Sequence, residues 1–330
     1  MVPPKGPRMR RSMLLLLLAI SMFGFSACDS KPAATPPAVQ PKEQEKDWKT
    51  TVDGAAVLAR TKRILSWGPR VSGSKGILGA RLEIKAMLAE IGIVSKDIIE
   101  QTFEAKTPNP PTAGKTSFTN IIARIPGRNA RGLALGAHYD SKHFEEFKFV
   151  GANDAASSVA LVIELAKAEV AKAKVTPREH TLWLLFFDGE EAFVDWHKNN
   201  DNTYGSREMV KHLAEYPVSG LVLVDMVGTK EILLADDANS SAHLKDILKR
   251  TSREVLGYNL LARPFSAVDD HVPFRDAKVP CVDLIDHAFD TSTWWHTVND
   301  TFENLDQRSL EKVGTMLGAA LSALEQACNQ

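Results

Sequence analysis

Two adjacent glutamates end a run of apolar residues, and their chemistry is the easiest part of this sequence to interpret. Residues 184–187 read Leu-Leu-Phe-Phe, and Glu190 and Glu191 follow after Asp188 and Gly189. Since successive side chains of an extended segment point in opposite directions, two neighbouring carboxylates at a strand end can do different jobs. One can hold a metal ion while the other carries a proton.

Other carboxylates and imidazoles close apolar runs elsewhere in the chain. His138 and Asp140 stand two positions apart at the end of the run 133–139, so that Asp140 can orient the imidazole beside a metal. Asp225 interrupts the apolar run 221–227, where an unpaired charge would be costly. A metal ion, a shared proton or a network of hydrogen bonds could each compensate this charge.

Asp154 and His296 are further candidates for chemistry. Asp154 precedes a helical pattern at 155–173, where a helix N-cap is the plainer interpretation. His296 follows Trp294 and Trp295, an indole pair that either packs in a core or lines a site. Two histidines and several carboxylates without a nearby cysteine suit catalytic zinc, which keeps one coordination position open for water or substrate.

The segments that must position these residues are mostly apolar on both faces. The predicted strands are 98–103, 118–125, 133–139, 181–187, 221–227 and 280–285, and the predicted helices include 51–65, 77–91, 155–173 and 242–255. Such strands, separated by helices, indicate an α/β fold: one twisted, mostly parallel mixed sheet with helices on both faces. Ligands of such sheets gather at the carboxyl ends of the strands, where the candidate residues are predicted to lie.

The length of 330 residues suits one catalytic domain, predicted at 50–330, after two N-terminal segments. Residues 1–27 combine basic residues with a short apolar block, which predicts a signal peptide. Cys28 follows small residues and resembles the lipidated cysteine of bacterial lipoproteins; an ordinary cleavage site is the alternative. The proline-rich stretch 28–49 predicts a disordered tether. We therefore expect an exported cell-envelope lipoprotein on the periplasmic side of a bacterial membrane, or a secreted protein.

Charge and cysteine content exclude several classes of protein. Lys and Arg number 40 against 41 Asp and Glu, which gives no electrostatic basis for binding nucleic acid or an anionic membrane surface. A lipid on Cys28 is therefore the one membrane contact that we expect. Three cysteines exclude a disulfide-rich scaffold, and Cys281, in an apolar run, is predicted to be a buried thiol.

The candidate residues as a set resemble the zinc aminopeptidase superfamily, whose members carry a two-zinc site. The resemblance rests on His138-Tyr139-Asp140, Asp154, Glu190-Glu191, Asp225 and His296. Several motifs more narrowly resemble the glutaminyl-peptide cyclotransferases (glutaminyl cyclases): 186–193 with Trp196, 204–207, 269–274, 295–297 and 303–306. This likeness runs from about Thr51 to the C-terminal helix.

The resemblance implies an acyltransferase that converts the N-terminal Gln of peptides or proteins to pyroglutamate and releases ammonia. It implies that one zinc ion is bound by Asp154, Glu191 and His296. It assigns general acid and base catalysis to Glu190, with two carboxylates hydrogen-bonded near it, Asp225 and Asp269. Aromatic side chains would line the substrate pocket, namely Trp196, Trp295 and, as a further contributor, Phe289.

Two positions depart from the family pattern. Asp283 stands where the animal cyclases carry a histidine, which leaves its role open. Ala137 stands where secreted animal enzymes carry a cysteine, which removes a disulfide without touching the chemistry.

Two other functions would use the same fold. A two-zinc exported aminopeptidase would hold a second metal with His138 and Asp225 and would use Glu190 to activate water. The indoles of Trp196 and of the Trp294-Trp295 pair argue against it, because they suggest a closed pocket for one small side chain. Asp269-Asp270-His271 also resembles the cyclases more than the peptidases. A non-catalytic surface lipoprotein would be expected to have lost ligands, yet all of them are present.

Overall fold

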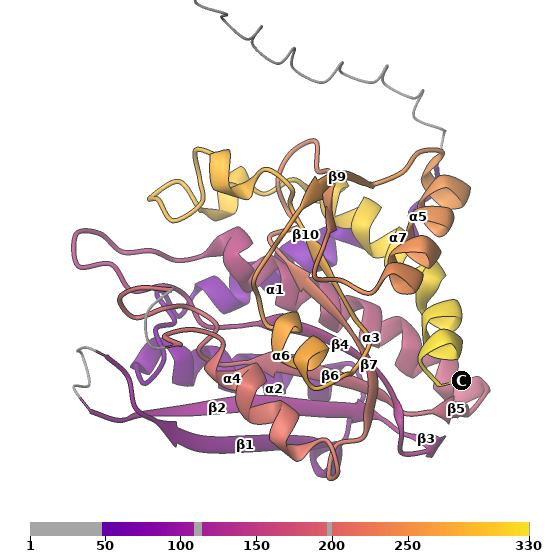
Figure 1. Cartoon of the computed structure of the whole chain (residues 1–330), viewed down its shortest axis with the longest axis horizontal. Helices are drawn as coiled ribbons and strands as arrows, with labels where there is room; N and C mark the ends of the chain where they lie inside the picture. Colours follow the sequence, from indigo (N-terminus) through magenta and orange to yellow (C-terminus); the bar gives the residue numbers. More distant parts are fainter. Residues whose placement is uncertain (1–47, 109–113, 197–199, 330) are drawn as a thin grey trace, which may run out of the picture. The chain divides into compact units, whose positions relative to one another are not determined.

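Six strands form the central sheet of the protein, in the order β1-β2-β6-β4-β7-β10 (Figure 1). The structure is a computed structural model, and it describes residues 48–108, 114–196 and 200–329. The predicted signal peptide, the predicted lipidation site Cys28 and nearly all of the predicted tether lie outside these residues.

The sheet is mixed and mostly parallel, as predicted. Its strands are β1 (Ile98–Ala105), β2 (Thr116–Ile125), β4 (Gly132–His138), β6 (Leu182–Phe187), β7 (Val218–Asp225) and β10 (Cys281–Ile285). β2 pairs antiparallel with β1 and β6, whereas the β6-β4, β4-β7 and β7-β10 pairs are parallel. Two short sheets were not predicted: β3 (Gly127–Asn129) with β5 (Arg178–His180), and β8 (Leu234–Asp237) with β9 (Leu261–Phe265).

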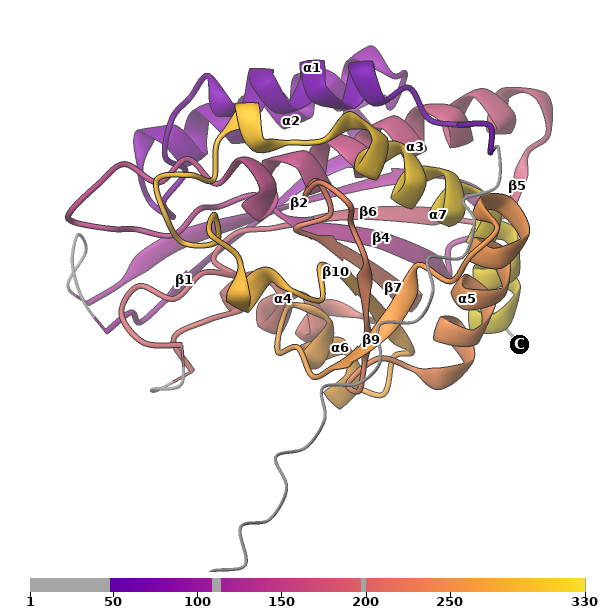
Figure 2. The ribbon, with the colours of Figure 1, turned by 90° about the horizontal axis from the view of Figure 1, so that it is seen from above.

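Helices cover both faces of the sheet (Figure 2). One face carries α1 (Gly54–Leu65), α2 (Lys75–Glu90), α3 (Ser157–Val175) and α7 (Gln307–Cys328). The other carries α4 (Tyr204–Met209) and α6 (His271–Asp276), while α5 (Ala242–Leu256) packs against α7. Single helical turns occur at Ser95–Asp97, Ala152–Ala156, Val210–His212, Phe289–Thr291 and Phe302–Asn304.

The sequence of β6 explains why both faces must be covered. Its side chains alternate between two apolar clusters, Leu182, Leu184 and Phe186 on one face and Trp183, Leu185 and Phe187 on the other. All are at most 2% exposed. Burying a large apolar side chain contributes about 1.5–3 kcal/mol, so leaving either face open would forfeit several kcal/mol from this strand alone.

The described part of the chain contains neither a disulfide bond nor a candidate membrane-spanning helix. Cys281 and Cys328 are buried free thiols, which confirms the prediction for Cys281. In residues 48–108, 114–196 and 200–329, no helix has the length and apolar character to cross a bilayer.

Candidate metal centre

Three neighbouring parallel strands bring predicted site residues to one edge of the sheet. His138 is the last residue of β4, Asp225 is the last residue of β7, and Glu190 and Glu191 follow the end of β6 closely. Because β6, β4 and β7 are parallel neighbours, their carboxyl ends lie side by side. The expected gathering of these four side chains is therefore confirmed.

Asp154 reaches the same edge from a helical turn, Ala152–Ala156, that precedes α3. Its own backbone is not helical and the N-cap of α3 is Ala156, so the N-cap interpretation of Asp154 is wrong. The carboxylate of Asp300 accepts hydrogen bonds from the backbone N–H groups of Asn153 at 2.7 Å and Asp154 at 3.1 Å. This anchoring leaves the Asp154 side chain free to face the strand ends.

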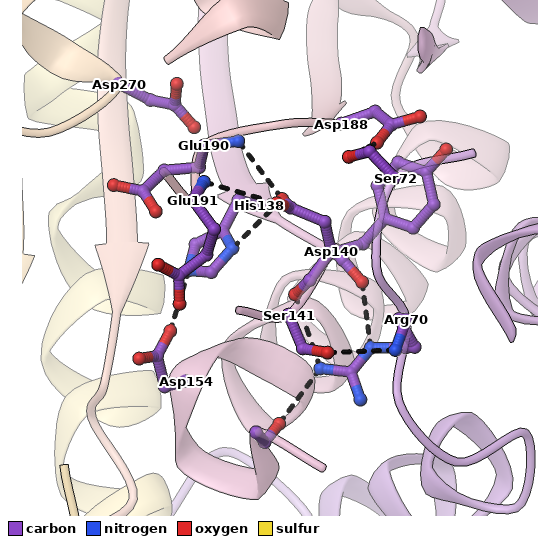
Figure 3. A network of polar contacts seen from close by, with 12 residues as sticks. Arg70, Ser72, His138, Asp140, Ser141, Asp154, Asp188, Glu190, Glu191 and Asp270 are labelled. Atoms are coloured by element: carbon purple, nitrogen blue, oxygen red, sulfur yellow. Dashed lines mark hydrogen bonds and ion pairs between the residues drawn. The ribbon is translucent and has the colours of Figure 1, made fainter. Parts of the chain in front are cut away.

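Asp154 joins two groups of potential metal ligands. Its Oδ2 lies 3.4 Å from His296 Nε2, which lies 3.3 Å from Glu191 Oε1. Its Oδ1 lies 3.1 Å from His138 Nε2, which lies 3.4 Å from Asp225 Oδ1. In each group the three ligand atoms lie within 4.8 Å of one another, and Figure 3 shows His138, Asp154 and Glu191 converging.

The donor atoms of both groups fit a divalent metal ion such as zinc. Each group offers one imidazole nitrogen and two carboxylate oxygens, which are ligand types of catalytic zinc. His138 Nε2 and Asp225 Oδ1 are buried and lie at ion-pair distance from each other, but neither atom makes a hydrogen bond in the described part of the chain. A bound metal would satisfy both atoms. His138 Nδ1 faces Asp140 Oδ1 at 3.3 Å, which directs Nε2 into the group.

The charges of the Asp154–Glu191–His296 group shift its pKa values. Burial alone would lower the pKa of His296, but Glu191 and Asp154 outweigh it and raise the pKa to about 9. Burial alone would raise the pKa of Glu191, but His296 and Lys142 lower it below its usual value. The pKa of Asp154 is likewise lowered against burial, by His138 and His296. Both carboxylates are therefore ionised at neutral pH and available as ligands.

Glu190, the predicted general acid and base, shows the opposite shift. It is 7% exposed, and burial, with the charges of Asp269 and Glu191, raises its pKa well above the usual value despite His138. Burial also raises the pKa of Asp225 to about 6 and that of Asp269 to about 7, with help from neighbouring carboxylates. The three predicted proton-carrying carboxyls thus form one electrostatically coupled cluster.

One predicted pocket aromatic, Trp295, packs on His296, and a second, Phe289, packs on Trp295. The ring of Trp295 stacks on the imidazole at 4.1 Å between centroids, and Phe289 meets Trp295 edge-on at 4.9 Å. Trp196 is half-buried in the segment that follows Glu191. Ring contacts among the described residues join Trp295 and Phe289 but do not extend to Trp196.

The loop after β4 contributes side chains that the sequence analysis missed. Lys142 Nζ lies 3.4 Å from Glu191 Oε2. Phe144 and Phe149 each meet the His296 ring edge-on at 5.8 Å between centroids. The signal in the sequence was the presence of several phenylalanines in the charged segment 139–151, because such side chains are expected to pack against other parts of the protein.

Asp283 lies on β10 in a second buried cluster. Its Oδ2 is 3.6 Å from His271 Nδ1, and His271 Nε2 is 3.2 Å from Asp237 Oδ2. All three side chains are fully buried. Burial and the nearby charge of Asp269 raise the pKa of Asp283 well above its usual value. Asp283 therefore belongs to the protein interior and not to a surface that substrate reaches.

The chain is similar to proteins of a known family. Residues 120–321 match the family model described as peptidase family M28. The chain is 30% identical over 286 residues to a glutaminyl-peptide cyclotransferase of Boiga irregularis, covering 75% of each chain. It is 32% identical over 281 residues to a glutaminyl-peptide cyclotransferase-like protein of Bos taurus, covering 77% of this chain and 71% of the relative.

The crystal structure of an Acidobacteriales bacterium glutaminyl cyclase superposes with a TM-score of 0.73 at 27% identity, covering 89% of this chain and 99% of that one. With these matches and the convergent ligand side chains, the chain belongs to the glutaminyl-peptide cyclotransferases of peptidase family M28.

Proposed function

We propose that this protein is a zinc-dependent glutaminyl-peptide cyclotransferase, which converts the N-terminal Gln of peptides or proteins to pyroglutamate and releases ammonia. One observation carries the proposal: Asp154, Glu191 and His296 converge from distant segments beside Glu190, a buried carboxyl with a raised pKa. Membership of the family supports the choice of reaction.

The proposed reaction is intramolecular. The α-amine of the substrate attacks the side-chain amide of the same residue, a five-membered ring closes and ammonia leaves. Because one residue supplies both nucleophile and electrophile, the protein gains most by holding the folded-back rotamer and excluding water. Trp295 and Phe289 form an apolar wall next to His296 that suits this task, and Trp196 is proposed to add to it.

Proton transfer is the work of the carboxyl cluster. A zinc ion held by Asp154, Glu191 and His296 would polarise the amide and stabilise negative charge on its oxygen. Glu190 takes the proton of the attacking amine and returns it to the amide nitrogen of the substrate, which can then leave as neutral ammonia. Its raised pKa lets Glu190 accept and donate near neutral pH. The neighbouring carboxyls of Asp225 and Asp269 share protons with it and titrate as a coupled set.

Ammonia release from a peptide with an N-terminal Gln tests this function. We expect ammonia and pyroglutamyl peptide in equal amounts, and one zinc per chain by elemental analysis. The matched control substrate is the same peptide with an acetylated α-amine, which lacks the nucleophile and must not react. Zinc-loaded protein that releases no ammonia would refute the activity, and active protein free of transition metals would refute the role of zinc.

A two-metal aminopeptidase is the second candidate, favoured by the group His138, Asp154 and Asp225 with its two unsatisfied atoms. In that enzyme Glu190 would activate water for peptide hydrolysis. Two zinc ions per chain together with release of aniline from a leucine anilide would establish it. Cyclisation of Gln peptides with a single zinc and no anilide hydrolysis would exclude it.

We also propose that the protein is exported and anchored through a lipid on Cys28 at the periplasmic side of a bacterial membrane. The support is the basic and apolar composition of 1–27 and the tether-like composition of 28–49. Cys28→Ala should abolish labelling by a fatty acid and release the protein from the membrane fraction. Unlabelled wild-type protein in the medium would instead support secretion.

A further inference from the structure

Arg70 is fully buried beside the metal centre, yet the sequence analysis gave it no role. Among the described residues, its guanidinium donates hydrogen bonds only to backbone carbonyls. Nε donates to Tyr139 O at 2.8 Å, and Nη1 donates to Val150 O at 2.5 Å. Nη2 donates to Gly151 O at 2.9 Å and, more weakly, to Asp140 O at 3.5 Å. Figure 3 shows the guanidinium next to Asp140 and Ser141.

These carbonyls belong to the two ends of one loop, residues 139–151, which connects β4 to the turn of Asp154. The backbone of Arg70 adds a further pair of bonds, since its N–H donates to Ser141 Oγ at 2.8 Å and its carbonyl accepts from Ser141 N–H at 3.3 Å. One planar group with fixed donor directions thus holds both ends of the loop together.

Each end of the loop leads directly to metal ligands. At the first end, the Asp140 carboxylate accepts the backbone N–H of Glu190 at 3.1 Å and of Glu191 at 3.2 Å. At the second end, Gly151 has a φ of +54°, and a Cβ there would lie 2.0 Å from Asp154 O and 3.3 Å from Arg70 Nη2. The backbone segments that carry Glu191 and Asp154 are therefore both held in place, through the two ends of the loop, by the same guanidinium.

The charge of Arg70 is unusual for a residue whose role is only to stabilise the fold. No carboxylate oxygen of the described residues lies within ion-pair distance of the guanidinium. At longer range it faces Asp140, Asp300, Asp154 and Glu191, and although burial lowers its pKa to about 10, it stays charged at neutral pH. A buried charge often stabilises a fold no better than an apolar side chain of similar size. The presence of Arg70 is therefore better explained by the positions of its hydrogen-bond donors and by its attraction to the nearby carboxylates.

We propose that Arg70 is a positioning residue of the metal centre. By holding both ends of the 139–151 loop it sets the distance between Asp154 and Glu191, and its charge offsets the repulsion between these two ligands. The inference rests on the proposed metal-dependent function, but its test measures metal binding directly and needs no turnover.

The test compares zinc affinity in purified Arg70→Met and Arg70→Lys, measured by competition with a chromophoric chelator at pH 7.5. Arg70→Met should weaken zinc binding by about 10- to 100-fold, the usual effect of removing a group that orients metal ligands. Arg70→Lys keeps the charge but has one ammonium in place of the fork, so we expect about a tenfold loss.

Arg178→Met is the matched control. Arg178 is also nearly buried, with its side chain 11% exposed, and it pairs with Glu169 and Glu325. It lies on β5, before the amino end of β6 and therefore at the opposite end of the sheet from the ligands. Arg178→Met should lower the thermal unfolding temperature but change zinc affinity by less than about threefold, because distant sites that share no partners act nearly independently.

Three results would overturn the inference: parental zinc affinity in folded Arg70→Met, parental affinity in Arg70→Lys if the Met variant does not fold, or an equal loss in Arg178→Met. Parental protein that binds no zinc would instead contradict the proposed function. The two failures are therefore distinguishable.

Discussion

Glu190 and Glu191 are neighbours in the chain, but their carboxyl groups have opposite pKa shifts. Burial dominates at Glu190, where the charge of Asp269 adds to it, and its pKa rises well above the usual value. At Glu191 the cations of His296 and Lys142 outweigh burial and the pKa falls. One carboxyl is suited to carry a proton and the other to stay ionised as a ligand.

Glu190→Gln should keep zinc and lose turnover. The amide has the same shape but cannot exchange a proton, so we expect kcat to fall by about two to four orders of magnitude. Zinc content and kcat on a Gln peptide check this. Unchanged turnover would remove Glu190 from the mechanism.

Zinc affinity should increase with pH. The pKa of His296 is raised to about 9 without metal, so at neutral pH its proton must leave before the imidazole can bind. Between pH 6 and 9 we expect affinity to rise by up to about tenfold per pH unit, flattening above the pKa. His296→Ala should bind zinc more weakly and lose most of this slope. A flat profile in the parental protein would contradict the assignment of His296 as a ligand.

The segment after β10 acts as a single element that supplies both a ligand and the apolar wall. His296 itself has a φ of +53°, a conformation that is uncommon for a residue with a side chain. Trp295 stacks on its ring, and Asp300 holds the backbone of Asn153 and Asp154. The segment is therefore tied to the turn that carries the other ligand, which explains how the conformation of His296 is maintained.

Trp295→Ala should impair substrate binding. Loss of the indole removes the apolar wall beside His296, and we expect KM for a Gln peptide to rise about fivefold, equivalent to an aromatic contact of roughly 1 kcal/mol. Trp67→Ala is the control, because Trp67 is 46% exposed in the turn before α2. Equal KM values in both variants would exclude Trp295 from the pocket.

At the scale of the molecule, the fold and the metal centre depend on different residues. The sheet is held between two apolar clusters, one under α1, α2, α3 and α7 and the other under α4 and α6. The ligands lie at the carboxyl ends of the strands, outside both clusters. Metal binding is thus expected to add stability to a protein that already folds without it.

Removal of metal by a chelator should leave the protein folded. At a free zinc concentration of about 100 times Kd, binding adds roughly 2.7 kcal/mol to the free energy of unfolding, which chelation removes. Far-UV circular dichroism at 25 °C should be unchanged while the thermal unfolding temperature falls. Loss of secondary structure on chelation would show that the metal is structural.

Local pattern was enough to predict the sheet and the residues at its strand ends. Apolar strands such as β6 need cover on both faces, and helical segments between successive strands indicate that the strands are parallel. Ligands bind at the carboxyl ends of parallel strands, so the positions of His138, Asp225 and Glu190 at strand ends were enough to predict that they meet. The roles of Asp154 and His296 came from the family resemblance, because their segments are irregular and carry no periodic signal.

Only the tertiary structure decided which distant side chains meet. His296 and Glu191 are 105 residues apart, and Arg70 reaches carbonyls about 70 to 80 residues away. Whether such groups touch depends on how loops pack over the sheet edge, and a loop's path is set by contacts with other elements rather than by its own residues. The sequence by itself therefore determined the fold and the ligand types. Packing decided that Arg70 bonds to both ends of the 139–151 loop, that Lys142 contacts Glu191 and that Asp283 is buried.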